Sequence, residues 1–287
     1  MAGNGEALLS SSGFWDDGEL ANQRCAKAKG MIFLALICLC YACLAHVLVP
    51  QDAPPASPLR AASACILAGG MLLEFGVDLT KMPAPKRQDE IFELLASAGK
   101  PIFLTFWILC IQTVQAVGVV VAEVSLLSSW PCLRLLTVCY TLSSFVGALG
   151  VVLTLLFLKF NWFEEKWQTN VRRLWEGRGI PFGLLTLLSH IPSMPVGILD
   201  VAIKDSTLLR LCAPLLYENV LAVFIFSMVY FIWIHIFWAL SGFQCWPYPF
   251  LHELNSPLKR LGLFVGIFIA ISLVMSCMQV LVLAKTG

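Results

Sequence analysis

The chain has 287 residues, of which 59% are hydrophobic and only 13% are charged. Soluble domains carry about 25% charged residues, so this composition excludes an ordinary soluble protein and indicates one that crosses a membrane several times. Lysine and arginine number 19 against 18 acidic residues, a net charge of +1, and no basic patch with interleaved aromatic residues is present. Membrane lipids are therefore the expected surroundings, and nucleic acid is not an expected partner.

The first 30 residues form a polar tail of mixed charge that contains glycine and serine. The first apolar run begins near Met31, too far along the chain for a cleavable signal peptide. We therefore expect a mobile tail over 1–30 and a transmembrane helical domain over 31–284.

A membrane-spanning helix needs about 20 mostly apolar residues. Six runs meet this requirement, and they predict an all-α, polytopic transmembrane helix bundle: 31–50, 102–123, 133–158, 180–203, 212–240 and 261–284. A shorter run, 61–77, contains Glu74 and is compatible with a span, a re-entrant segment or a surface helix. The sequence thus predicts six or seven spans. Seven spans divide the basic residues 14 to 5 between the two faces, whereas six spans divide them 12 to 7, so the positive-inside rule favours seven.

Both topologies place the loop at 159–179 in the cytosol. In this loop Phe163, Trp167, Val171 and Leu174 recur at helical spacing, with Glu and Arg side chains on the opposite face. The pattern is typical of an amphipathic helix that lies in the membrane interface. Such a helix either anchors the bundle or docks a lipid.

The fourth run combines a histidine with two prolines. Pro192 and Pro195 lack backbone N–H groups, which frees the carbonyls of Leu188 and Ile191 and predicts a kinked or opened helix around His190. Ionisable side chains inside spans are costly and are candidates for function. The alternative is a kinked helix whose histidine only packs.

A second polar pattern lies in the segment "KPIFLTFWILCIQTVQAVG", residues 100–118. Thr105 and Gln112 are seven residues apart, so they share one face of a helix. A polar stripe in a span should face the bundle interior or a wet cavity. A threonine in such a helix more commonly bonds back to its own turn, which is the alternative here.

Motifs for metal and cofactor chemistry do not occur in the sequence. The four histidines are isolated, there is no HExxH or GxSxG pattern, and the CxxC spacing of Cys40 and Cys43 stands alone within an apolar run. The 11 cysteines lie mostly within apolar runs, where they act as small packing residues. No metal and no cofactor are expected.

Three segments of the chain resemble the androgen-induced gene/androgen-dependent TFPI-regulating protein family. The first is "FLTFWILCIQ", in which a threonine is followed by a glutamine seven residues later. The second is His190 with Pro195 and Asp200, preceded by the pair Ile180-Pro181. The third is "WIHIFWALSGFQCWPYPFL", an aromatic helix followed by Gly, Trp and Tyr-Pro-Phe-Leu.

The resemblance covers about 100–284 and implies an activity. Members of this family are integral membrane hydrolases that cleave fatty acid esters of hydroxy fatty acids with a threonine nucleophile and a histidine. By position, Thr105 would be the nucleophile and His190 the base. Asp200 is a shared feature without an assigned role, and Gln112, on the face of Thr105, is a candidate oxyanion donor. A lipid ester is then the expected substrate, and the expected location is the endoplasmic reticulum or the plasma membrane.

The chain departs from the family pattern in its first 100 residues, which are longer, and 61–77 has no evident counterpart. The gap between Gly242 and Trp246 is also two residues wider than usual. Two other classes remain open. One is a non-enzymatic multi-span lipid-binding protein or receptor. The other is a small transporter, although broken helices in paired halves, its usual sign, do not occur.

Overall fold

The computed structural model describes most of the chain, in these ranges: 20–81, 101, 103–128, 130–163, 165, 168–169, 172, 176, 182–188, 190–240, 251, 254 and 256–286. Over these residues the chain is helical and contains no strand, which confirms the predicted all-α bundle. The elements in chain order are α2 (Leu20–Val47), α3 (Pro58–Lys81), α5 (Leu104–Leu126), α6 (Leu133–Thr141), α7 (Ser143–Phe157), the π-helix η2 (Leu158–Trp162), α9 (Phe182–Leu188), α10 (Ser193–Ile203), α11 (Ser206–Cys212), α12 (Leu216–Leu240) and α14 (Pro257–Thr286).

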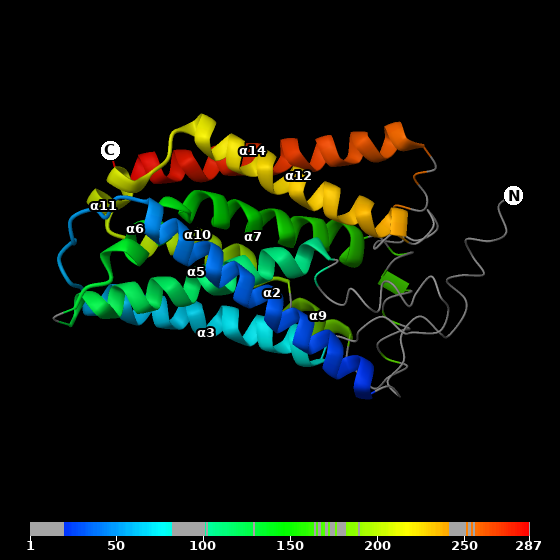
Figure 1. The fold of residues 1–287 in the computed structure, drawn as a ribbon, viewed down its shortest axis with the longest axis horizontal. Helices are drawn as coiled ribbons and strands as arrows, with labels where there is room; N and C mark the ends of the chain where they lie inside the picture. Colours follow the sequence, from blue (N-terminus) through cyan, green and yellow to red (C-terminus); the bar gives the residue numbers. More distant parts are fainter. Residues whose placement is uncertain are drawn as a thin grey trace, which may run out of the picture.

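The long helices run side by side along the bundle (Figure 1). In this view α12 and α14 lie along one edge, α3 lies along the other, and α7, α10 and α5 occupy the middle. Helix α14 ends at the end of the bundle where α11 sits, whereas α2 begins at the opposite end. The bundle therefore has two ends, one marked by α11 and the other by the start of α2.

Five helices are long and apolar enough to cross a membrane: Lys27–Val47 within α2, Pro58–Leu79 within α3, and α5, α12 and α14. Helices α6 and α7 also qualify if they are taken together, with a bend of 49° between them. The predicted span at 133–158 is therefore bent rather than continuous. The run at 61–77, whose behaviour the sequence left open, lies within a helix long enough to span.

The predicted span at 180–203 is not one helix, because it is divided into α9 and α10. The 11 residues of α10 extend about 16 Å, well short of the 30 Å hydrocarbon core. Seven spans would require α9 and α10 to cross as one broken span. The predicted span at 212–240 also begins later than expected, at Leu216, and the segment before it forms α11.

Two predicted segments, the N-terminal tail and the loop at 159–179, fall largely outside the described residues. Residues 1–19 of the tail are among them, whereas 20–30 belong to the first turns of α2. The amphipathic helix at 159–179 also stays a prediction. At its few described positions, Phe163 is exposed and Arg172 forms an exposed ion pair with Glu176, with an N–O distance of 3.8 Å.

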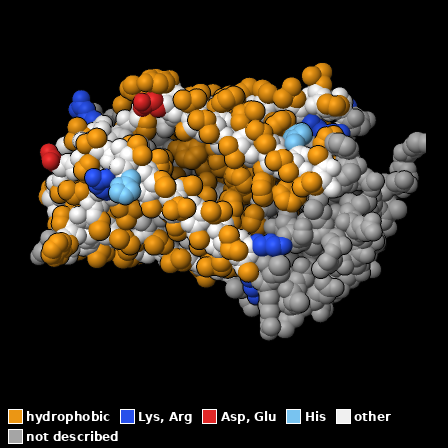
Figure 2. Space-filling model, in the orientation of Figure 1, with side chains coloured by type: hydrophobic (Ala, Val, Ile, Leu, Met, Phe, Trp, Pro, Cys, Tyr) orange, Lys and Arg blue, Asp and Glu red, His pale blue; other side chains and the backbone are white. Residues whose placement is uncertain are grey.

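The surface of the described helices suits a lipid environment. In the space-filling view hydrophobic side chains cover the middle of the molecule, and charged side chains gather toward the two ends (Figure 2). Large apolar side chains on α2, α12 and α14 are exposed, among them Leu39, Ile232 and Leu273. An apolar belt between two polar ends is what a membrane protein presents to the bilayer.

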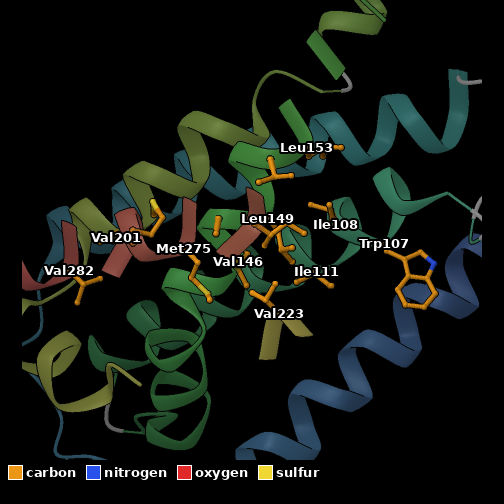
Figure 3. Close-up of a cluster of buried hydrophobic side chains, with 14 of the residues drawn as sticks. Trp107, Ile108, Ile111, Val146, Leu149, Leu153, Val201, Val223, Met275 and Val282 are labelled. Carbon is orange, nitrogen blue, oxygen red and sulfur yellow. The ribbon is translucent and has the colours of Figure 1, made fainter. Parts of the chain in front are cut away.

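The core lies where α5, α7, α10, α12 and α14 meet (Figure 3). Leu149 of α7 lies among side chains from the neighbouring helices, including Ile108 and Met275. Helices α7 and α10 approach closely through glycines, since a Cβ added to Gly197 would lie 2.9 Å from the Cα of Gly147. Small residues permit this approach, and close backbone packing is a main source of helix association in membranes.

Candidate active site

The histidine singled out by the sequence lies at a break in the chain, between the end of α9 at Leu188 and the start of α10 at Ser193. The His190 and Ile191 N–H groups both donate to the carbonyl of Leu187, at 3.2 and 2.9 Å. Pro192 is the N-cap of α10. Its ring cannot continue the hydrogen-bond ladder of α9, so the helix ends and a new one begins. The predicted opening of the helix around His190 is confirmed.

Helix α7 holds His190 from one side. The imidazole stacks on the ring of Phe157, with centroids 4.3 Å apart and an interplanar angle of 15°. The Thr154 hydroxyl donates to the His190 carbonyl at 2.7 Å. His190 is only 7% exposed. The histidine therefore has a fixed backbone and a fixed ring plane inside the bundle.

The turn that follows the histidine is bound to α5 and α3. The Gln112 amide donates from Nε2 to the carbonyl of Ser193 at 3.0 Å. The Ser193 hydroxyl donates to Oε1 of Glu74 at 2.8 Å. All three residues are buried. Helix α5, which carries Thr105, is thus tied directly to the first turn after His190.

Thr105 is the second residue of α5 and is partly exposed. The first N–H groups of a helix have no partner within it. The Leu104 N–H donates to the hydroxyl of Tyr230 at 3.0 Å, and the Phe106 and Trp107 N–H groups donate to the carbonyl of Phe103. Within the part of the chain that the structure describes, no acceptor takes the Thr105 N–H. Among the described residues, the Thr105 backbone N–H is thus a donor without an acceptor, and it lies next to its own hydroxyl.

Aromatic side chains fix this end of α5. The indole N–H groups of Trp107 and Trp233 both donate to the carbonyl of Pro101, at 2.6 and 2.9 Å. The ring of Trp107 also packs edge-on against Tyr230, with centroids 5.5 Å apart. These contacts bind the start of α5 to α12 and restrict the position of Thr105.

The other two predicted site residues have contacts of their own. Gln112 lies two turns beyond Thr105, about 10 Å along the helix, and bridges to Ser193. Its role as an oxyanion donor stays a prediction. Asp200 forms an ion pair with Lys204, with an O–N distance of 2.6 Å, and Lys204 also donates to the carbonyl of Cys139 at 2.8 Å and to the Ser143 hydroxyl. Lys204 therefore links Asp200 of α10 to α6 and α7, ten residues along the chain from His190.

A second group of charged side chains surrounds the buried Glu123 at the same end of the bundle. Arg60 of α3 pairs with Glu123 of α5 at 3.1 Å and with Asp205 at 3.5 Å. The Tyr140 hydroxyl donates to the other Glu123 oxygen at 2.7 Å. Glu123 is thus part of a network that joins four segments of the chain.

Beside Gln112 and Asp200 lies a narrow gap, partly open to the outside, with room for about one water molecule. Its polar lining comes from Gln112, Gln115 and Asp200, and its walls come from α3, α5, α7 and α10. In the described part of the chain no three His, Cys, Asp or Glu side chains are grouped to hold a metal ion. The gap can hold a water molecule bonded to these polar side chains, and it is too small for a lipid group.

The other histidine deep in a span is bonded on its own helix. The His235 Nδ1 atom lies 2.8 Å from the Phe231 carbonyl, and its ring packs on the ring of Phe231. In these contacts His235 packs on its own helix, α12. Among the deep histidines, His190 is the one at a helix break.

Fold and site together define a polytopic helical membrane protein with a buried histidine at a broken helix and a threonine at the start of a neighbouring one. The model of the FAR-17a/AIG1-like protein family matches residues 79–282, so the chain belongs to this family, the androgen-induced gene family. The matched segment contains Thr105, His190 and Asp200. Neither a curated protein nor a solved structure matched the chain.

Proposed function

We propose that this protein is an intramembrane carboxylic ester hydrolase in which Thr105 is the nucleophile and His190 is the base. The observation that carries the proposal is the tie between the two elements: Gln112 of α5 donates to the carbonyl of Ser193, in the turn after His190. Membership of the family supports the same assignment. The proposed substrates are lipid esters, in particular fatty acid esters of hydroxy fatty acids.

The proposed reaction has two halves. The Thr105 hydroxyl attacks the ester carbonyl carbon while its proton passes to the His190 imidazole. When the ester C–O bond breaks, the imidazolium gives this proton to the departing alkoxide, which leaves as the hydroxy fatty acid. Water then attacks the acyl-threonine, His190 takes its proton and returns one to the threonine oxygen, and the free fatty acid leaves. No cofactor is required.

The oxyanion that forms in each half needs a donor. The Thr105 N–H belongs to the same residue as the attacking oxygen and has no acceptor among the described residues. A donor at the start of a helix also carries part of the positive end of the helix dipole. We therefore assign the oxyanion donor to the Thr105 backbone, because the Gln112 amide lies about 10 Å further along the helix and donates to Ser193.

The apolar surface supports a lipid substrate. An ester dissolved in the bilayer would meet exposed apolar side chains on the bundle, such as those of Leu39 and Ile232. The proposed membranes are the endoplasmic reticulum and the plasma membrane.

The proposal is tested by a fluorophosphonate probe that labels activated hydroxyl nucleophiles. We expect the purified wild-type protein to be labelled on Thr105, as located by peptide mass spectrometry, and Thr105→Ala to remain unlabelled. Thr113→Ala is the matched control, because the Thr113 hydroxyl is on the same helix but donates to its own Leu109 carbonyl at 2.8 Å. Equal labelling of Thr105→Ala and wild type would refute the nucleophile. Wild-type protein that binds lipid but takes no label would favour the non-enzymatic alternative.

A further inference from the structure

Glu74 is a carboxylic acid in the interior of the helix bundle. It lies in α3, before the segment that matches the family, and its side chain has no solvent exposure. One oxygen, Oε1, accepts the hydrogen bond from Ser193. A buried carboxyl group in a membrane span is energetically costly, so Glu74 is a candidate for a specific role through its hydrogen bond with Ser193.

The neutral acid is the form of Glu74 that costs less free energy to bury, because an ionised carboxylate would need several hydrogen-bond donors here. In that state one oxygen carries a hydrogen and the group both donates and accepts. Among the described residues, Oε2 of Glu74 and Oε1 of Gln112 have no hydrogen-bond partner. The two atoms belong to the two side chains that bind Ser193.

Ser193 is thus held from both sides. Glu74 accepts from its hydroxyl and Gln112 donates to its carbonyl. A protonated Oε2 is the complement of the acceptor on Gln112, so a direct bond or one bridging water would close a ring of hydrogen bonds around Ser193. Such a ring fixes the backbone of the first turn of α10.

The His190 backbone needs support of this kind. It lies where α9 has ended and α10 has not begun, so it lacks the continuous ladder of a helix. Thr154 holds the histidine carbonyl from α7, and the Ser193 contacts hold the next turn from α3 and α5. Glu74 is the contribution of α3 to this support.

We propose that Glu74 is a positioning residue, which acts through Ser193 to hold the His190 turn in place relative to Thr105. The inference rests on the proposed hydrolase function. It gives α3, which is outside the family-matched segment for most of its length, a direct part in the geometry of the site. Glu74 neither touches the substrate nor transfers a proton to it.

The experiment compares Glu74→Ala, Glu74→Gln and Ser193→Ala with wild type in two measurements. The first is the rate of fluorophosphonate labelling of Thr105. We expect Glu74→Ala and Ser193→Ala to slow it roughly 10- to 100-fold, the effect of a small misplacement of a catalytic group. Glu74→Gln should restore most of the rate, because its amide is neutral and still offers an acceptor to Ser193. Because both single changes break the same contact, the double alanine variant should be no slower than either.

The second measurement is hydrogen–deuterium exchange of the peptide that contains His190 and Ser193, which does not depend on activity. Exchange should rise in Glu74→Ala and stay at the wild-type level in Glu74→Gln. The control is Met71→Leu, a change at a fully buried α3 position one turn away. Unchanged exchange or unchanged labelling in Glu74→Ala would overturn the inference, as would failure of Glu74→Gln to restore labelling. An unlabelled wild-type protein would instead overturn the proposed function.

Discussion

Replacing His190 by glutamine should lower kcat for ester hydrolysis by about 10²- to 10⁴-fold, the usual contribution of a positioned general base. Glutamine is similar in length and still forms hydrogen bonds, but it cannot take the proton of Thr105. The His190 carbonyl, which accepts from Thr154, belongs to the backbone and is retained. The fold should therefore survive while turnover is lost. The measurement is steady-state hydrolysis of a branched fatty acid ester by purified protein, with thermal stability recorded alongside.

The matched control for this change is His235→Gln. His235 also lies within a membrane-spanning helix, α12, but its Nδ1 atom is bonded to the carbonyl of Phe231 on the same helix. We expect kcat of His235→Gln to stay within about threefold of wild type. If His190→Gln keeps as much activity as His235→Gln, His190 is not the base.

Replacing Lys204 by methionine should destabilise the protein by about 3–5 kcal/mol, the range for a buried ion pair that loses one partner. Lys204 is 2% exposed and its ammonium binds three groups: the Asp200 carboxylate, the Cys139 carbonyl and the Ser143 hydroxyl. Methionine keeps the length of the side chain and leaves the carboxylate without its cation. Reversible unfolding in SDS measures the change in free energy.

The double variant Asp200→Leu/Lys204→Met separates the pair from its surroundings. Removing both charges together should recover much of the loss, because a buried pair is often replaceable by apolar residues. The coupling energy from the four proteins should be at least about 1 kcal/mol. If the two single substitutions have additive effects, so that the coupling energy is close to zero, the ion pair does not stabilise the bundle.

The lengths of the apolar runs were sufficient to predict the helix bundle. The positions at which helices break or bend were predicted less well. The spans at 102–123 and 261–284 correspond to α5 and α14, because long runs of apolar residues have few other stable conformations in a membrane. The bend between α6 and α7 has no proline, and its cause is local: the Ser143 hydroxyl donates to the carbonyl of Cys139, four residues earlier, at 3.0 Å, a contact that often bends helices. The length of α3 was also hard to read, because Glu74 and Asp78 interrupt its hydropathy.

The chemistry of the site was predictable only in part. The prolines pointed to the break at His190, and seven-residue spacing placed Thr105 and Gln112 on one helix. The ion pair between Asp200 and Lys204 was missed, although the i,i+4 spacing was a usable signal. The contact between Glu74 and Ser193 joins residues 119 positions apart, so no local pattern could have revealed it.

The most direct test of the central claim is the structure of the wild-type protein with a phosphonate bound covalently. We expect the phosphorus to be bonded to the Thr105 oxygen. We also expect a His190 ring nitrogen within hydrogen-bond reach of this oxygen, about 2.6–3.2 Å, or one water away. A phosphonate on another residue, or a His190 ring more than about 10 Å from the Thr105 oxygen with no shared cavity, would contradict the account.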